Sequence, residues 1–166
     1  MDLSELDTEA VEFLRAGGDS LHPSLAARVL EHAKLEVALE SAIRQLKDGK
    51  RPIITFSFAN APSSIDAVAT LGKRFSKPAM DVFIKRLRAR MKEEGIDSRV
   101  AVLRGRANEA GDLAPADKNA VNMFQGGEAK ALVMTVDAGA VGTNLQDKNG
   151  DAPRYLIALE FMNVAA

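Results

Sequence analysis

The sequence predicts an α/β fold with a mainly parallel central sheet, and three observations carry this prediction. Short, almost wholly apolar runs alternate with amphipathic segments of helical period along most of the chain. The apolar runs lack the strict alternation of strands with one wet face, so helices are expected to cover both faces of the sheet. The chain of 166 residues is also long enough to bury a sizeable core in one domain.

Composition narrows the functional classes. The chain has 46% hydrophobic residues, 27% charged residues and a formal net charge of −1. Because the net charge is so small, the molecule as a whole does not attract nucleic acid or membrane, and any such contact requires a local charged patch. The absence of cysteine excludes disulfides and thiolate metal sites. No apolar run approaches the roughly 20 residues of a membrane span, and the acidic start MDLSELD is unlike a signal peptide. We therefore expect a cytoplasmic protein, with nucleoid or nucleus as the alternative compartments.

The first third of the chain predicts two helices and one strand. Residues 3–16 form an amphipathic segment that ends at Gly17-Gly18. Ser24 suits an N-cap, and the apolar stripe that follows predicts one helix from there to about Asp48. The β-branched run RPIITFSF (51–58) predicts a buried strand. Residues 59–77 predict a loop with one short helix.

The remaining elements alternate regularly. Pro78 suits a first helical turn, and clean i, i+3, i+4 apolar spacing predicts a helix from there to about Glu94, ended by Gly95. A further helix is expected over residues 115–124. Three more apolar runs predict strands at 99–105, 130–136 and 154–161.

The turn DAGAVGTN (137–144) follows the strand predicted at 130–136. In open parallel sheets, ligands bind at the carboxyl ends of the strands. Gly139 and Gly142 would let a phosphate, a ribose or another domain approach the backbone closely. A tight strand-to-helix connection without any ligand is the alternative interpretation of the same spacing.

Motifs for independent hydrolysis of a nucleoside triphosphate are missing. The chain lacks a G-x-x-x-x-G-K-[ST] phosphate loop, and Gly72-Lys73 is followed by Arg74, which has no metal-binding hydroxyl. The acidic dipeptide Asp-Glu, the usual magnesium motif, occurs nowhere. We expect no catalytic residue, no metal site and no cofactor for this chain alone.

Other polar residues allow two interpretations each. His22 and His32, the only histidines, are expected to be structural or solvated rather than metal ligands. The basic run on the helix predicted at 78–94 fits a solvated amphipathic face, with nucleic-acid contact as the alternative; it comprises Lys85, Arg86, Arg88, Arg90 and Lys92. Arg104 and Arg106, just past a predicted strand, are better placed for phosphate contact.

Several segments resemble one family in the right order. HAKLEVALESAIRQLKDGKRPIITFSF resembles the lead-in helix and motif IV strand of superfamily 2 helicases and translocases. VAVLRG and PADKNAVNMFQGGEAKALVMTVDAGAVGTNLQ resemble the second half of their C-terminal RecA-like lobe. The pattern A-G-x-x-G-x-N-L (138–145) is similar to motif V of Swi/Snf-type and strawberry-notch-type ATPases, and RYLIALEFMNVAA is similar to the approach to motif VI.

The resemblance implies a three-layer RecA-like lobe over residues 30–166, with residues 1–29 as a helical lead-in and 59–77 as an insertion. In that family, ATP with Mg²⁺ lies between two such lobes, and DNA or RNA runs across both. The resemblance places Gly139, Gly142 and Asn144 at the interlobe nucleotide cleft. It places Ser57, Arg104 and Thr135 near the nucleic-acid backbone.

The departures from the family pattern matter as well. The glutamine and G-R-x-x-R of motif VI, and the whole first lobe, are missing from these 166 residues. We therefore expect an incomplete helicase or translocase lobe that needs an N-terminal lobe, in cis or in trans, to hydrolyse ATP. A catalytically inactive interaction module that retains the lobe fold is the alternative, and an unrelated small α/β protein is a further one.

Overall fold

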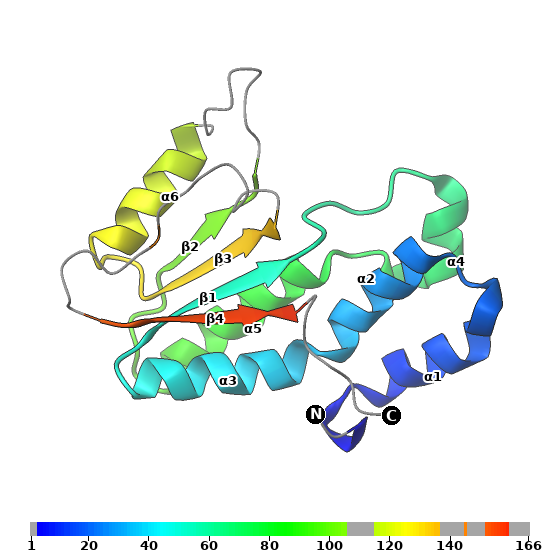
Figure 1. Cartoon of the computed structure of the whole chain (residues 1–166), viewed down its shortest axis with the longest axis horizontal. Coiled ribbons are helices and arrows are strands. Elements are labelled where there is room, and N and C mark those ends of the chain that lie inside the picture. Colours follow the sequence, from blue (N-terminus) through cyan, green and yellow to red (C-terminus); the bar gives the residue numbers. More distant parts are fainter. Residues whose placement is uncertain (1–2, 106–114, 137–144, 146–151, 160–166) are drawn as a thin grey trace.

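The computed structural model describes residues 3–105, 115–136, 145 and 152–159. It contains a four-stranded sheet in the order β2-β3-β1-β4, and every neighbouring pair is parallel (Figure 1). The strands are β1 (Arg51–Phe56), β2 (Val100–Leu103), β3 (Ala131–Thr135) and β4 (Arg154–Ala158). Helices flank this sheet, so the predicted α/β class with a parallel central sheet is confirmed.

Helices α3 (Leu35–Lys47) and α5 (Ala79–Glu93) cover one face of the sheet. The apolar stripes that predicted both helices lie in this core, where the rings of Phe56 and Phe83 pack with their centroids 5.4 Å apart. Helix α5 begins directly after Pro78, as predicted, and Gly95, which follows its C-cap residue, has a φ of 73° that favours glycine. Residues from all four strands complete the core on this side.

Helix α6 (Pro115–Gln125) covers the opposite face. Its buried Ala120 and Phe124 pack against Leu103 of β2 and against Leu132 and Met134 of β3. Side chains of β3 alternate between the two cores, because successive residues of a strand point to opposite faces. Covering helices on both faces explain why the strands read as continuous apolar runs.

A third apolar cluster lies beside the sheet. It joins the N-terminal helices to α4 (Ile65–Phe75), which lies within the segment expected to be an insertion. The N-terminal elements are the 3-10 helices η1 (Leu3–Glu5) and η2 (Gly18–Ser20), together with α1 (Thr8–Gly17) and α2 (Pro23–Ala33). Leu71 and Phe75 of α4 meet Ala10 of α1 and Val29 of α2 in this cluster. The expected boundary between residues 29 and 30 therefore falls inside α2, and the insertion shares a core with the N-terminal helices.

The prediction of one helix from Ser24 to Asp48 is wrong, because two helices meet at Lys34. The Lys34 side chain is buried, and its Nζ donates a hydrogen bond of 2.7 Å to the carbonyl oxygen of Leu159. This bond ties the corner between α2 and α3 to the end of β4. The first predicted helix likewise divides into η1 and α1, because Asp7 caps α1 by accepting from the Ala10 N–H at 3.0 Å.

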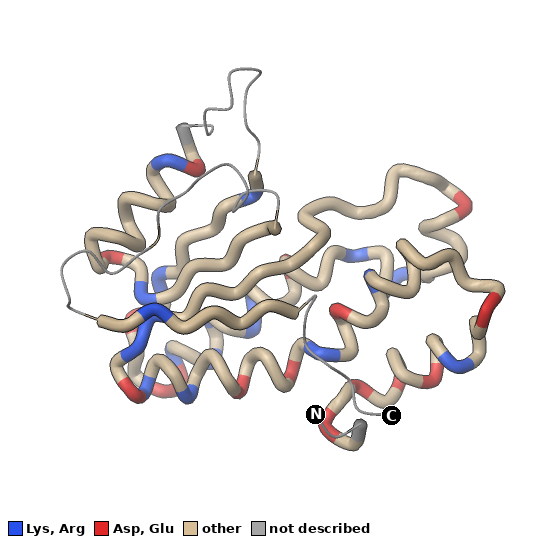
Figure 2. Tube along the Cα trace, viewed as in Figure 1, with Lys and Arg blue, Asp and Glu red and all other residues tan. Residues whose placement is uncertain are grey.

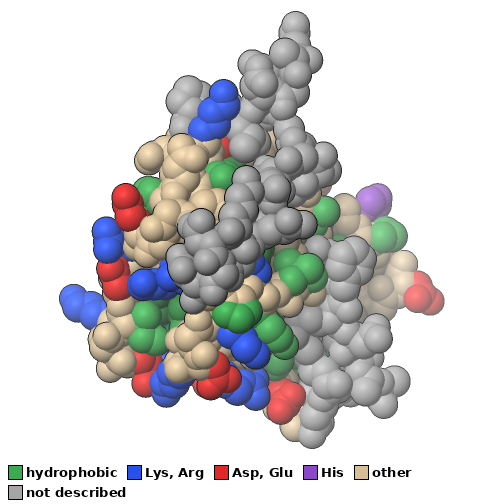
Figure 3. All heavy atoms as spheres, turned by 60° about the vertical axis from the view of Figure 1, so that its left-hand side comes forward, with side chains coloured by type: hydrophobic (Ala, Val, Ile, Leu, Met, Phe, Trp, Pro, Cys, Tyr) green, Lys and Arg blue, Asp and Glu red, His purple; other side chains and the backbone are tan. Residues whose placement is uncertain are grey.

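Charges on the covering helices are mostly paired. Helix α3 is acidic in its first turn and basic in its last, the order that the helix dipole favours (Figure 2). Its Glu36 and Glu40 form ion pairs with Arg86 and Arg90 of α5. Two members of the basic run on α5 thus serve helix packing. At the end of the molecule that Figure 3 brings forward, acidic and basic side chains are interspersed rather than gathered by sign. Within the described ranges, no helix combines the length and apolar character needed to cross a bilayer.

Candidate functional site

A cavity of about 510 Å³ opens where β1, β2 and β3 end, and we call it the strand-end cavity. Ser57, Arg104 and Thr135, which the sequence places on three different strand ends, all line it. Parallel strands bring their carboxyl ends to one edge of the sheet, which explains why residues so distant in sequence converge. The remaining lining residues are Arg28, Phe58, Ala59, Asn60, Gly105, Ala116 and Asp117.

Ser57 is the first residue after β1 and is exposed. Its backbone N–H donates a hydrogen bond of 2.8 Å to Oε2 of Glu31, a buried residue of α2. This hydrogen bond fixes the backbone at the end of β1 to α2. The exposed serine can supply both a hydroxyl donor and an acceptor to a ligand in the cavity.

Arg104 follows β2, and its side chain crosses the rim of the cavity. The guanidinium donates a hydrogen bond of 2.8 Å to Oδ1 of Asp81 on α5 and one of 3.3 Å to the carbonyl oxygen of Ala59. The Arg104 backbone N–H also donates to Asp117 Oδ1 at 3.2 Å. With 42% of the Arg104 side chain exposed, the guanidinium is oriented and still reachable by an anion.

Thr135 differs from the other two residues because it is only 3% exposed. It lies at the end of β3 and forms part of the cavity wall. Its small accessible surface limits it to a short contact with any ligand. Ser57 and Arg104 therefore offer the accessible polar groups, and Thr135 shapes the site.

Arg28 and Phe58 belong to the same cavity, and the sequence did not point to either. The guanidinium of Arg28, on α2, lies 4.2 Å from the centroid of the Phe58 ring and donates 2.7 Å to the carbonyl oxygen of Asn60. Burial lowers the pKa of Arg28, and the negative charge of nearby Glu31 opposes that shift. Arg28 thus adds a second cation to the cavity and orders residues 58–60. No sequence signal identified it, because its position depends on how α2 packs beside β1.

Three predicted cleft residues, Gly139, Gly142 and Asn144, lie outside the described residues, and so does Arg106. The proposed nucleotide side of the site is therefore a prediction from sequence alone. The other three predicted residues, Ser57, Arg104 and Thr135, line one cavity, as described above.

The two histidines have structural roles. His22 caps α2, because its Nδ1 accepts from the Ser24 N–H at 3.1 Å. His32 is 3% exposed, and its Nε2 lies 2.7 Å from the Lys77 carbonyl oxygen, to which it donates. Burial lowers the pKa of His32, only partly offset by this hydrogen bond, and the positive charge of Arg74 lowers it further. In the described part of the chain, no three His, Asp or Glu side chains are arranged to hold a metal ion.

No protein-family model, curated protein or solved structure matches this chain. Its site is therefore interpreted from its own residues and geometry.

Proposed function

We propose that this chain is the C-terminal RecA-like lobe of an ATP-dependent helicase or DNA translocase, and that its strand-end cavity contacts the nucleic-acid backbone. One observation carries the proposal. Ser57, Arg104 and Thr135 come from three separate motif-like segments, and they line a single cavity at the carboxyl edge of the sheet.

The chemistry of the cavity suits a phosphodiester. Arg104 and Arg28 supply positive charge, and the exposed Ser57 supplies a hydroxyl donor. None of these groups distinguishes one base from another, so the expected contact is independent of sequence. The proposal assigns Gly139, Gly142 and Asn144 to the cleft for ATP with Mg²⁺, which forms only with an N-terminal lobe.

Binding to labelled oligonucleotides tests the proposal. We expect the chain to bind single-stranded or duplex DNA, or RNA, in fluorescence anisotropy, with an affinity that falls as salt rises. Arg104→Gln removes a charged phosphate donor and should weaken binding by about 1.5–3 kcal/mol, at least about tenfold. Ser57→Ala should weaken it less, because one neutral hydrogen bond is lost.

Asp81→Asn is the control that separates binding from structure. This variant breaks the ion pair with Arg104 but keeps the guanidinium in the cavity. If Arg104 contacts phosphate, Asp81→Asn should bind as tightly as the native chain or more tightly, because an acidic competitor is gone. Equal weakening in both variants would mean that Arg104 only orders the rim. Absence of saturable binding to any of the three nucleic acids would overturn the proposal.

A further inference from the structure

A second hollow, of about 370 Å³, lies between α2, α4 and α5 and is strongly basic. Lys73, Arg74, Lys77 and Arg86 line it together with His32, and its described lining contains no acidic side chain. We call it the basic hollow. Four cations around one space repel one another unless counter-charges or a ligand compensate them.

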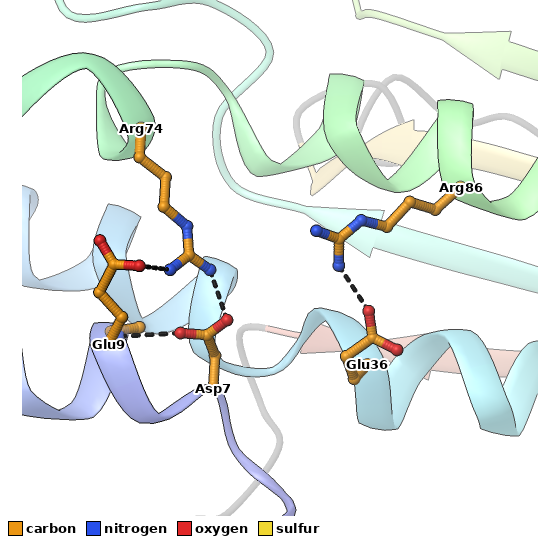
Figure 4. Close-up of polar contacts among 6 residues, drawn as sticks. Asp7, Glu9, Glu36, Arg74 and Arg86 are labelled. Carbon is orange, nitrogen blue, oxygen red and sulfur yellow. Dashed lines mark hydrogen bonds and ion pairs between the residues drawn. The ribbon is translucent and has the colours of Figure 1, made fainter.

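Within the part of the chain that the structure describes, acidic residues outside the hollow compensate only the two arginines. Arg74 is held by Asp7 and Glu9 at the start of α1, and Arg86 is held by Glu36 of α3 (Figure 4). Figure 4 shows the two guanidiniums extending from α4 and α5 toward these carboxylates, so both are fixed in direction. Among the described residues, neither Lys73 nor Lys77 forms an ion pair, and both are exposed. The two ammonium groups are therefore the uncompensated charge of the hollow.

The backbone at Gly72 separates the lysine-bearing turn from the rest of α4. Gly72 has φ 77° and ψ 178° inside this helix, a conformation that side-chain-bearing residues rarely adopt. The kink makes residues 73–75 a distinct terminal turn, whose Phe75 is buried while Lys73 is exposed. The backbone conformation of Gly72 thus sets the course of the turn that carries Lys73.

Shared and paired residues link the basic hollow to the strand-end cavity. A neighbouring hollow, also of about 370 Å³, shares Lys77 and Val82 with it and adds Asp81 and Lys85. Asp81 in turn is paired with Arg104, which lines the strand-end cavity. Shared or paired lining residues therefore relate three spaces with basic side chains around the start of α5, and we call the surface along them the path.

We infer that this path binds the phosphodiester backbone of a nucleic-acid strand, with Lys73 and Lys77 contacting phosphates beyond the strand-end cavity. A single small anion would occupy one hollow, whereas a linear polyanion uses a connected series of them. The inference rests on the proposed function, because the strand must also enter the strand-end cavity.

The length and salt dependence of binding test this inference in the intact chain. We expect the native chain to bind an oligothymidylate of ~16 nucleotides more tightly than one of ~6, because the longer strand reaches the basic hollow. In Lys73→Gln/Lys77→Gln, this gain with length should disappear. The slope of log K against log salt on the longer strand should fall by about 1.4, or about 0.7 for each lost phosphate contact.

A matched control removes two exposed charges from α5 that lie outside the path. Arg88 and Lys92 lie on α5, are exposed and line none of the hollows described above. Arg88→Gln/Lys92→Gln should keep the native length dependence and salt slope. If both double variants lost the length dependence and the salt slope to the same extent, net charge alone would explain the change, and the inference would be overturned. Unfolding curves should match for all three chains, because the replaced side chains are exposed.

The two histidines provide a readout that does not depend on affinity. His32 lines the basic hollow, whereas His22 caps the far end of α2 and is exposed. Bound phosphate should raise the lowered pKa of His32 and shift its imidazole NMR signals, leaving those of His22 in place. If Arg104→Gln weakens binding but neither the lysine variant nor the His32 signals respond, the path is wrong while the proposed function stands. If the native chain binds no nucleic acid, the proposed function fails as well.

Discussion

Asp7 performs two tasks with one carboxylate. Oδ1 caps α1 at Ala10, and Oδ2 forms the ion pair with Arg74 of α4. Partial burial alone would raise the pKa of Asp7, but the hydrogen bonds from Arg74 and Ala10 lower it. The Asp7 carboxylate therefore stabilises the folded chain fully at pH values above its ordinary pKa of 3.8, and this contribution is lost as the pH falls below that value.

Replacing Asp7 separates the two tasks. Asp7→Ala removes both and should lower the free energy of unfolding by about 1–2 kcal/mol, measured by chemical denaturation. Asp7→Asn keeps an oxygen that can cap α1 and removes only the charge, so it should lower the free energy of unfolding clearly less than Asp7→Ala does. Equal losses in the two variants would mean that the ion pair, not the cap, carries the stability.

His32 predicts a pH dependence of stability. Burial lowers its pKa in the folded chain, while the unfolded chain titrates near the ordinary value of 6.5. Below that value the unfolded state binds more protons, so the free energy of unfolding should decrease as the pH falls through about 6.5. Arg74 and Arg86 line the same hollow as His32 and oppose its protonation, whereas Asp7 favours it.

His32→Gln should remove this decrease, because an amide has no charge to acquire and can still donate to the Lys77 carbonyl. Chemical denaturation at a series of pH values measures the effect, with His22→Gln as control. A native chain whose stability is constant between pH 7 and the range where carboxylates titrate would contradict the assignment.

The sequence could predict some site residues and not others. Ser57, Arg104 and Thr135 were proposed because of the resemblance to a helicase lobe, and only Arg104 was also singled out by its position just past a predicted strand. All three lie at the end of an apolar run, where parallel strands present ligands. Arg28 lies on α2, and the sequence did not identify it because the position of α2 beside β1 depends on packing in three dimensions. Lys73 and Lys77 were also missed, because their hollow is assembled from helices that are distant in sequence.

At the scale of elements, α4 is the one short helix that the sequence predicted within residues 59–77, but its packing against α1 and α2 was not expected. Its Leu71 is 2% exposed in the cluster with α1 and α2, whereas Ile65 on the same helix is 86% exposed. Leu71→Ala should lower the free energy of unfolding by about 2–5 kcal/mol. Ile65→Ala should change it by less than about 0.5 kcal/mol. Denaturation of both variants checks this, and a small effect of Leu71→Ala would show that α4 is only loosely attached.

Regular elements were predictable where local pattern decides them. Helix α5 and all four strands matched their apolar runs within a few residues, because their cores repeat the helical or extended period. The break between α2 and α3 was not predictable, since the hydrogen-bond partner of Lys34 is Leu159, far along the chain. The sheet order was equally out of reach, because no local pattern specifies which strands are neighbours.

At the scale of the whole molecule, the chain should bind nucleic acid without hydrolysing ATP. It has neither a phosphate-loop sequence nor the acidic dipeptide of the usual magnesium motif. A phosphate-release assay with purified chain, with and without DNA, should show no turnover above background. DNA-stimulated turnover would contradict our proposal that this chain is one lobe of a two-lobe enzyme.

The parallel pairing of β1 with β3 and β4 also has a consequence for how the chain reaches its native state. Ile53 lies opposite both Leu132 and Leu156. The inner strand β1 therefore pairs with its neighbours only after segments that are distant in sequence come together. Sheets with such distant pairings fold slowly compared with helical bundles. On the ribosome, β1 emerges well before either partner, and α3 is the neighbouring element already available to cover its apolar face. We therefore expect the α3–β1 unit to protect the nascent chain from aggregation until the sheet is complete.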